Sequence, residues 1–336
     1  MILQHIDFGP VAGASGVEGF FGGKKSEYWF HKPWKWLGLL NLEGMTFTAK
    51  TSTLEARLEP ENSKGNMRLK ADGITPAHWF PDCVKARFWS GDMLNAVGLS
   101  GLGLMTLLTD GRWQERDKPF FISIAAVGKT RGERLGEISA MIRMLVMFKT
   151  SFNTPFGLQI NFSCPNAGHK LNGADNELVS EVAEVLDIAL ELGVPLVPKF
   201  AVTLSLNAMQ NVARLRACDA LHFSNTIPFG QLPERINWKG IFGSEQSPLT
   251  KYGGGGLSGP KLFPLVLERV KELREAGIEK PILAGGGITR QQDVYQLFQA
   301  GNKQVGDFAI ALGAVVPFRP WRVAGIIRRA HELCKR

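Results

Sequence analysis

Residues 158–166 read LQINFSCPN, an apolar run that ends in asparagine, serine and cysteine. Short, near-continuous apolar runs of this kind are typical of parallel strands that are buried on both faces. Seven similar runs occur, and each is followed by a small or polar residue. The eight predicted strands are Val11–Ala14, Met45–Lys50, Phe121–Ala125, Leu158–Ser163, Leu196–Phe200, Ala220–Asn225, Ile282–Gly286 and Phe308–Gly313.

Helical segments fill several gaps between these runs, as parallel strands require. The predicted helices are Glu177–Leu192, Leu204–Arg216, Pro264–Ala276 and Gln291–Ala300. Eight strand–helix units predict an α/β protein with the architecture of a TIM-type (β/α)8 barrel. The alternative is a doubly wound open sheet, but no GxGxxG follows the first strand and the glycine cluster Gly253–Gly256 comes late in the chain.

Two stretches in the first third of the chain exceed a minimal barrel. We predict one domain over residues 1–336, with inserts at 28–40 and 54–92. The first insert is rich in tryptophan and lysine. An amphipathic aromatic segment can lie on a membrane surface, but we expect this one to pack against the barrel or a second subunit.

Charge and cysteine usage limit the classes of partner and cofactor. The formal net charge is +8, and the basic residues are spread along the chain, which favours anionic small molecules over nucleic acid. The cysteines Cys83, Cys164, Cys218 and Cys334 form no CxxC pair, so we expect no metal site and an organic electron carrier. The chain shows no signal peptide or membrane span, and we expect it in the cytoplasm.

Polar residues follow the predicted strands at their carboxyl ends, where barrels place their active sites. Asn161, Asn166 and Asn225, with Asn95 from an earlier loop, offer amide groups that suit a pyrimidine ring. A single asparagine at such a place is more often a turn or a cap, but three at successive strand ends favour a binding site.

Glycines and a lysine at later strand ends favour a phosphorylated, redox-active cofactor. Gly285–Gly287 and Gly313 follow the seventh and eighth strands, where barrels often bind phosphate, although glycine also ends strands for steric reasons. Lys199 lies inside an apolar run and needs a partner if it is buried. The N1–C2=O edge of a flavin, which becomes anionic on reduction, would supply that partner.

Cys164 follows the fourth predicted strand between Ser163 and Pro165. A lone cysteine is usually a small buried hydrophobe. At a strand end among asparagines it can act as a base, because a fraction of the thiol is ionised to thiolate at neutral pH and the thiolate can accept a proton.

The string Gln159–Asn166 resembles the strand-four signature of the dihydroorotate dehydrogenase family, in its cytosolic class 1 form with a cysteine base. Further segments resemble the family in the same order along nearly the whole chain. They are Ala14–Val17, Thr46–Thr53, Asn95–Leu99, Phe121–Ala125, Asn225–Thr226, Gly255–Gly259 and Gly285–Ile288.

The resemblance implies FMN-dependent oxidation of dihydroorotate to orotate in pyrimidine biosynthesis, with Cys164 taking the C5 proton and flavin N5 the C6 hydride. It implies substrate binding by Lys50, Asn95, Gly98, Leu99, Asn161, Asn166, Asn225 and Thr226. It implies cofactor binding by Ala14, Ser15, Lys50, Thr51, Ser123, Asn161, Lys199, Asn225, Ser258, Gly259, Gly286, Gly287, Leu312, Gly313 and Ala314.

The oxidant and two rival functions stay open at this point. The resemblance allows fumarate, a quinone, or NAD through a separate iron–sulfur flavoprotein subunit, and we expect a homodimer. Class 2 members carry a serine base and an N-terminal extension, whereas this sequence has Cys164 at the base position. The two inserts, however, are larger than expected for class 1. The rivals are an FMN-dependent reductase of another pyrimidine or an enone, and a phosphorylated-ligand-binding barrel without redox activity.

Overall fold

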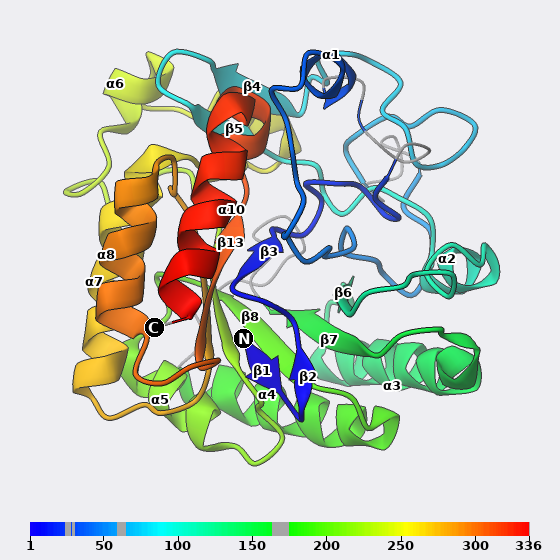
Figure 1. Cartoon of the computed structure of the whole chain (residues 1–336). Helices are drawn as coiled ribbons and strands as arrows, with labels where there is room; N and C mark the ends of the chain where they lie inside the picture. Colours follow the sequence, from blue (N-terminus) through cyan, green and yellow to red (C-terminus); the bar gives the residue numbers. More distant parts are fainter. Residues whose placement is uncertain (24–27, 29–30, 59–64, 163–174, 336) are drawn as a thin grey trace.

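The computed structural model describes residues 1–23, 28, 31–58, 65–162 and 175–335 (Figure 1). Its centre is a curled sheet of seven parallel strands, with the helices outside. The strand order is β3 (Val11–Gly13), β13 (Phe308–Leu312), β12 (Ile282–Gly285), β9 (Leu221–Asn225), β8 (Leu196–Ala201), β7 (Phe156–Asn161) and β6 (Phe120–Ile124).

The segment predicted as the second strand, Met45–Lys50, lies between the two ends of this sheet. Thr46 forms a parallel bridge to Ala12 in β3, and Thr48 forms one to Phe121 in β6. The segment is not a regular strand, because its backbone groups are divided between neighbours: Lys50 N–H donates to Gly19 rather than to β6. The barrel is therefore closed by isolated bridges, and the predicted (β/α)8 architecture is confirmed.

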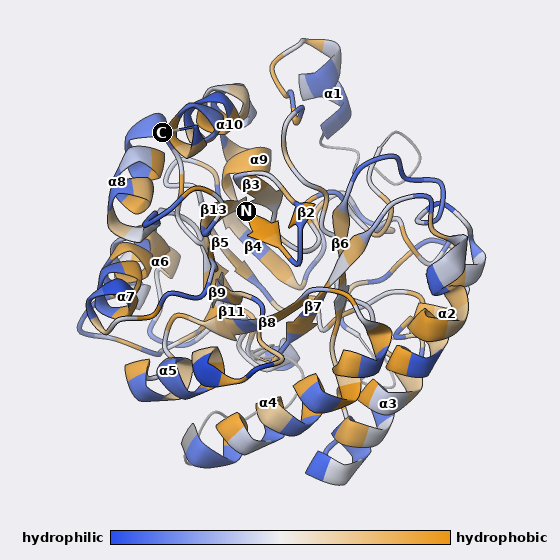
Figure 2. Ribbon diagram, turned by 60° about the horizontal axis from the view of Figure 1, so that its bottom comes forward, coloured by the Kyte–Doolittle hydropathy of each residue, from blue (hydrophilic) through white to orange (hydrophobic). Residues whose placement is uncertain are grey.

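Helices cover the outside of the barrel and hold its layers together (Figures 1 and 2). The four predicted helices are present as α4, α5, α7 and α8. The first was predicted to run to Leu192, but its last turn, Leu190–Leu192, is a 3-10 helix. No helix among the described residues is long and apolar enough to cross a membrane. The larger helices are α2 (Leu104–Thr109), α3 (Arg131–Phe148), α4 (Asp175–Ala189), α5 (Leu206–Arg214), α7 (Phe263–Glu275), α8 (Gln291–Gly301) and α10 (Pro320–Cys334).

Strand residues alternate between the inside of the barrel and the helical layer, as a period of two requires. In β12, Leu283 packs inward with the barrel filling, and Ile282 packs outward with the helices. Near the amino ends of the strands the filling is apolar, and Phe8 stacks on Phe121 with ring centroids 4.3 Å apart. Other buried positions along the same strands carry polar side chains, which are Ser123, Gln159, Asn161, Lys199 and His222.

Several segments build a second layer beyond the carboxyl ends of the strands, and parts of the two predicted inserts belong to it. A four-stranded antiparallel sheet runs in the order β10 (Ile227–Pro228), β11 (Gly256–Ser258), β5 (Asp92–Asn95) and β4 (Val84–Arg87). The short helices α1 (His31–Trp36), α6 (Trp238–Phe242) and α9 (Val315–Phe318) lie at the same end, whereas the hairpin β1 (Ile2–Leu3) and β2 (Ile6–Asp7) lies at the other (Figure 1).

Arg274 in α7 ties three parts of the barrel together. Its buried guanidinium donates to Gly301 O at 2.7 Å and to Ile278 O at 2.6 Å, and it pairs with Asp307 at 3.3 Å. Arg274→Met keeps the volume but leaves a buried carboxylate and carbonyls without their donor. We expect a loss of about 3–5 kcal/mol of unfolding free energy in urea denaturation.

The matched control is Arg329→Met, which removes an ion pair to Glu332 at the surface of α10. That change should cost less than about 1 kcal/mol. Equal losses for the two variants would contradict the structural role given to Arg274.

Candidate active site

A cleft of about 930 Å³ opens at the carboxyl ends of the barrel strands. This volume is typical of a site for a cofactor together with a small substrate. Most of the residues predicted from the sequence lie on its wall. They are Ala14, Ser15, Lys50, Thr51, Asn95, Gly98, Leu99, Asn161, Lys199, Asn225, Thr226, Ser258, Gly259, Gly286, Gly287, Gly313 and Ala314.

Ser123 and Leu312 lie behind this wall rather than on it, since both are fully buried. Ser123 still acts on the site through a chain of hydroxyls. Its Oγ lies 2.9 Å from Thr51 Oγ1, which lies 2.7 Å from Ser15 Oγ. Thr51 N–H also donates to Ser15 Oγ at 2.9 Å, so the three strand ends hold one another in place.

Lys199 lies on the floor of the cleft with a side chain only 5% exposed. In the sheet it is the neighbour of Asn161 in β7 and of His222 in β9. His222 Nδ1 lies 2.8 Å from Gln159 Nε2. Burial and the Lys199 ammonium lower the pKa of His222 well below its usual value, so the imidazole is neutral at physiological pH. The floor therefore carries a buried ammonium, and a neutral imidazole lies behind it on the neighbouring strand.

Asn161 and Asn225 form a pair of side-chain amides. They come from β7 and β9, the two strands that flank the strand of Lys199. Asn225 Nδ2 donates to Asn161 Oδ1 at 2.9 Å, and Asn225 Oδ1 accepts from Thr226 N–H at 2.9 Å. These bonds fix the orientation of both amides at the ends of β7 and β9. Such a pair can read the alternating C=O and N–H groups of a planar ring.

Lys50 and the loop Asn95–Leu99 form the opposite wall. The Lys50 ammonium donates to Ser100 O and lies 4.6 Å from the centre of the Phe20 ring. Gly98 and Leu99 both have positive φ, at 68° and 59°. A leucine in the left-handed region is strained, and such strain is often kept at binding sites.

Glycine loops form a narrow end of the cleft near the start of α7. A Cβ atom on Gly287, whose φ is +76°, would lie 2.4 Å from the backbone nitrogen of Phe263. Only glycine lets this loop approach the first residue of α7 so closely. Backbone N–H groups and the start of a helix at such a place favour a phosphate group.

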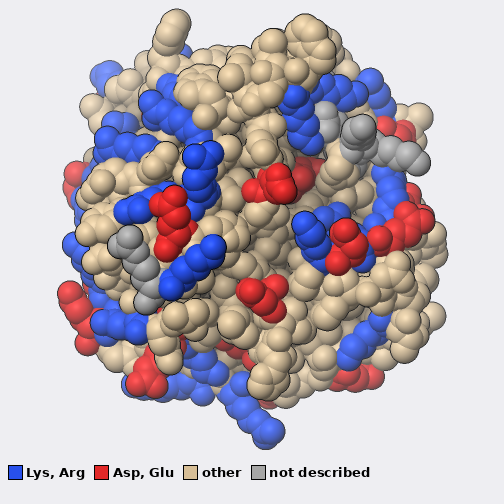
Figure 3. Space-filling view, viewed as in Figure 1, with Lys and Arg blue, Asp and Glu red and all other residues tan. Residues whose placement is uncertain are grey.

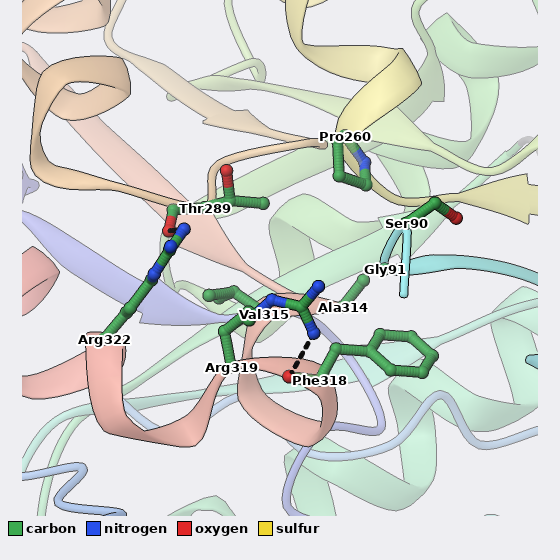
Figure 4. A pocket seen from close by; sticks show the side chains of 9 residues that line it. All are labelled: Ser90, Gly91, Pro260, Thr289, Ala314, Val315, Phe318, Arg319 and Arg322. Carbon is green, nitrogen blue, oxygen red and sulfur yellow. Dashed lines mark hydrogen bonds between the residues drawn. The ribbon is translucent and has the colours of Figure 1, made fainter. Parts of the chain in front are cut away.

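A side pocket of about 170 Å³ adjoins this end and was not predicted (Figure 4). Arg319 and Arg322 extend into it from the start of α10, and Ser90 and Pro260 lie opposite. Arg319 donates to Phe318 O at 2.8 Å and to Trp89 O at 2.6 Å. It therefore joins the second insert to the barrel and adds positive charge beside Ala314.

The outer half of the cleft is aromatic, which sequence reasoning missed. It is lined by Trp34, Trp79, Phe80, Trp89 and Trp321, among others. The available signal was the tryptophan content of the two inserts. Its meaning depended on where the inserts lie, which no local pattern gives.

Cys164 and Asn166 lie outside the described residues, so their predicted roles stay predictions. Two other cysteines are poor candidates for a base. Burial raises the pKa of Cys83 to about 11 and that of Cys218 to about 12. Both are therefore protonated thiols at neutral pH.

The sequence profile of the family described as "Dihydroorotate dehydrogenase" matches residues 50–317. The chain belongs to the dihydroorotate dehydrogenase family. Members of this family are oxidoreductases that oxidise dihydroorotate in pyrimidine biosynthesis with a flavin, so the predicted activity is confirmed at this level and the non-enzyme alternative falls.

Individual relatives agree with this assignment. The chain is 31% identical to "Dihydroorotate dehydrogenase B (NAD(+)), catalytic subunit" of Anoxybacillus flavithermus over 80% of this chain and 79% of the relative. It is 26% identical to the protein of the same name from Streptococcus pneumoniae R6 over 73% of this chain and 74% of the relative.

The dihydroorotate dehydrogenase site fits a flavin on structural grounds. The glycine end of the cleft has the close backbone approach that a phosphate needs, and a Cβ on Gly287 would close it. The floor presents the buried Lys199 ammonium, a positive charge that would suit the N1–C2=O edge of a bound flavin, which becomes anionic on reduction.

Proposed function

We propose that this dihydroorotate dehydrogenase uses FMN as its flavin and binds dihydroorotate over the Asn161–Asn225 pair. The observation that carries the proposal is this pair of mutually bonded amides beside the buried Lys199. A binding site for an apolar ligand has no use for a buried lysine beside two mutually bonded amides. An enzyme that reduces a flavin beside a pyrimidine uses all three groups.

The substrate would lie between the amides and the Lys50 wall. Asn95, Asn161, Asn166, Asn225 and Thr226 would bind the ring, and Gly98 and Leu99 would close over it. Lys50 would hold the carboxylate, since its ammonium is already fixed at the wall by Ser100 O. These contacts orient the C5 and C6 carbons, and closure of the loop excludes water.

FMN would lie along the deeper part of the cleft. Ala14, Ser15, Thr51, Lys199 and the strand-end glycines named above would hold it, with its phosphate at Gly286, Gly287, Gly313 and Ala314. Arg319 and Arg322 raise the positive potential at that end (Figure 4). Bound FMN supplies a hydride acceptor at N5.

The chain itself supplies the proton acceptor. We propose that the Cys164 thiolate takes the proton from C5 while the C6 hydride leaves, so that dihydroorotate loses two electrons and two hydrogens. Lys199 would place a positive charge beside bound FMN and so favour its reduced, anionic form. Ser123 acts at a distance by holding Thr51.

For the oxidant we favour NAD through a separate subunit, because the two relatives named above are NAD(+)-linked catalytic subunits by name. Fumarate and quinone are the alternatives. The homodimer and the cytoplasmic location are further parts of the proposal.

The deciding experiment is anaerobic. We expect the purified protein to show the visible bands of FMN and to lose them rapidly when dihydroorotate is added. NAD added to this chain alone should not restore the bands, whereas fumarate or a soluble quinone would restore them if either were the acceptor. Bound flavin that stays oxidised with dihydroorotate but is reduced by another pyrimidine would redirect the substrate assignment.

A further inference from the structure

Large apolar side chains gather at the end of the molecule where the cleft opens. We call residues 31–40, 76–91 and 315–322 the aromatic face. They make up about a tenth of the chain, yet they hold eight of the fifteen exposed large hydrophobic side chains among the described residues. Trp89 is 97% exposed, Trp36 85%, Phe80 69% and Trp79 68%. Contiguous exposed apolar surface of this kind usually marks an interaction site.

Direct contacts join the three segments into one surface. The rings of Trp34 and Trp321 lie 6.3 Å apart, and those of Phe88 and Phe318 lie 5.6 Å apart. Arg319 donates to the carbonyls of Phe88 and Trp89. The face is thus held by the barrel and does not depend on one loop.

The first insert was expected to pack against the barrel or a second subunit, and within this chain only part of it packs on the barrel. Trp34 packs on Trp321, but Trp36, two residues later, projects into solvent. A helix that points one indole inward can present the other to a partner.

The charges on the aromatic face have one predominant sign. Its segments carry six basic residues, Lys32, Lys35, Lys85, Arg87, Arg319 and Arg322, and one acidic residue, Asp82. In the space-filling view the end that carries α1 and β4 is largely uncharged, and Lys and Arg side chains border it (Figure 3). The partner should therefore be apolar or amphipathic, with negative charge at its surface.

A second copy of the chain does not suit this face. A twofold dimer through it would bring together two faces that both carry a net positive charge. Indole and phenyl rings bordered by lysine and arginine are instead the combination that binds the headgroup region of a bilayer.

We propose that the aromatic face docks the enzyme on an anionic lipid bilayer. The most exposed rings, Trp36 and Trp89, enter the interface, while Lys32 and Lys85 meet the lipid phosphates. Because Trp79, Phe80 and Trp89 also line the outer cleft, docking brings the mouth of the active site to the headgroup region.

The test is co-sedimentation of the flavin-loaded enzyme with phosphatidylcholine vesicles, with and without phosphatidylglycerol. We expect binding to the anionic vesicles that weakens with salt. Trp36→Ala with Trp89→Ala should lower the affinity at least about tenfold. Lys32→Gln with Lys85→Gln should lower it about thirtyfold on anionic vesicles and remove the preference for phosphatidylglycerol.

The matched control is Met147→Ala, which removes an exposed apolar side chain from α3. It should bind vesicles like the unmodified enzyme, and thermal unfolding checks that every variant folds. No vesicle binding, or equal binding by the tryptophan and Met147 variants, would overturn the proposal. So would a change from dimer to monomer in the tryptophan variant, since this would assign the face to a second copy.

This proposal is independent of the catalytic one. Dihydroorotate-driven bleaching of the flavin is measured without vesicles, so failure of either assay leaves the other result intact.

Discussion

Replacement of Cys164 by alanine is expected to leave FMN bound and to slow flavin reduction by dihydroorotate by about 10²–10⁴-fold. That range is typical for loss of a positioned general base. The measurement is stopped-flow reduction under anaerobic conditions, with bound flavin counted from its visible bands. An alanine variant that reduces flavin at the unmodified rate would remove Cys164 from the mechanism.

Cys218→Ala is the matched control for this experiment. Cys218 is equally a lone cysteine, but it is buried in the core, burial raises its pKa to about 12, and its thiol donates to the Ala220 carbonyl. We expect the control to reduce flavin at the unmodified rate.

Cys164→Ser should recover part of the activity as pH rises. A hydroxyl has a much higher pKa than a thiol, so the fraction of ionised base increases with pH over a higher range than in the cysteine enzyme. A serine variant with the pH profile of the unmodified enzyme would mean that another group sets the ionisation.

Replacement of Lys199 by methionine should have the second largest effect. The change keeps the length and volume of the side chain but removes a buried ammonium from the floor of the cleft. We expect the rate of flavin reduction to fall about 10²-fold, the typical loss for one electrostatic contact to developing charge. The midpoint potential of the flavin should become more negative, because the reduced, anionic ring loses its counter-charge.

Lys280→Met is the control, since the Lys280 ammonium is also partly buried but donates to Cys218 O away from the cleft. Its flavin potential should not change. A slower Lys199→Met enzyme with an unchanged potential would mean that Lys199 acts on the substrate rather than on the flavin.

Most of the strands could be predicted because they are buried on both faces and read as near-continuous apolar runs. Leu196–Phe200 and Phe308–Gly313 differ from β8 and β13 by one residue at one end. The strand-end polar residues followed from the same argument, since parallel strands bring their carboxyl ends together. For this reason the sequence predicts Asn161, Lys199 and Asn225 at one site, and all three line the cleft.

Features that depend on partners distant in sequence could not be predicted. The segment Met45–Lys50 has the composition of a strand, but its hydrogen bonds are shared among three neighbours. β4 and β5 exist because β5 pairs with β11, about 160 residues later. Ser123 and Leu312 resemble cleft residues in the sequence, but Ser123 is fully buried against Thr51 and Leu312 packs outward against the helices.

The pairing of β3 with β13 has a consequence for the order of events during synthesis. Val11 is the neighbour of Ile310, so the barrel's earliest strand finds its partner only when almost the whole chain exists. At ribosomal rates of about 5–20 residues per second, the interval is roughly 15 to 60 s. During that time one side of β3 has no strand beside it, and an unpaired apolar edge is a place where nascent chains aggregate. We therefore expect the yield of native enzyme in the cell to depend on chaperone supply more than its final stability would suggest.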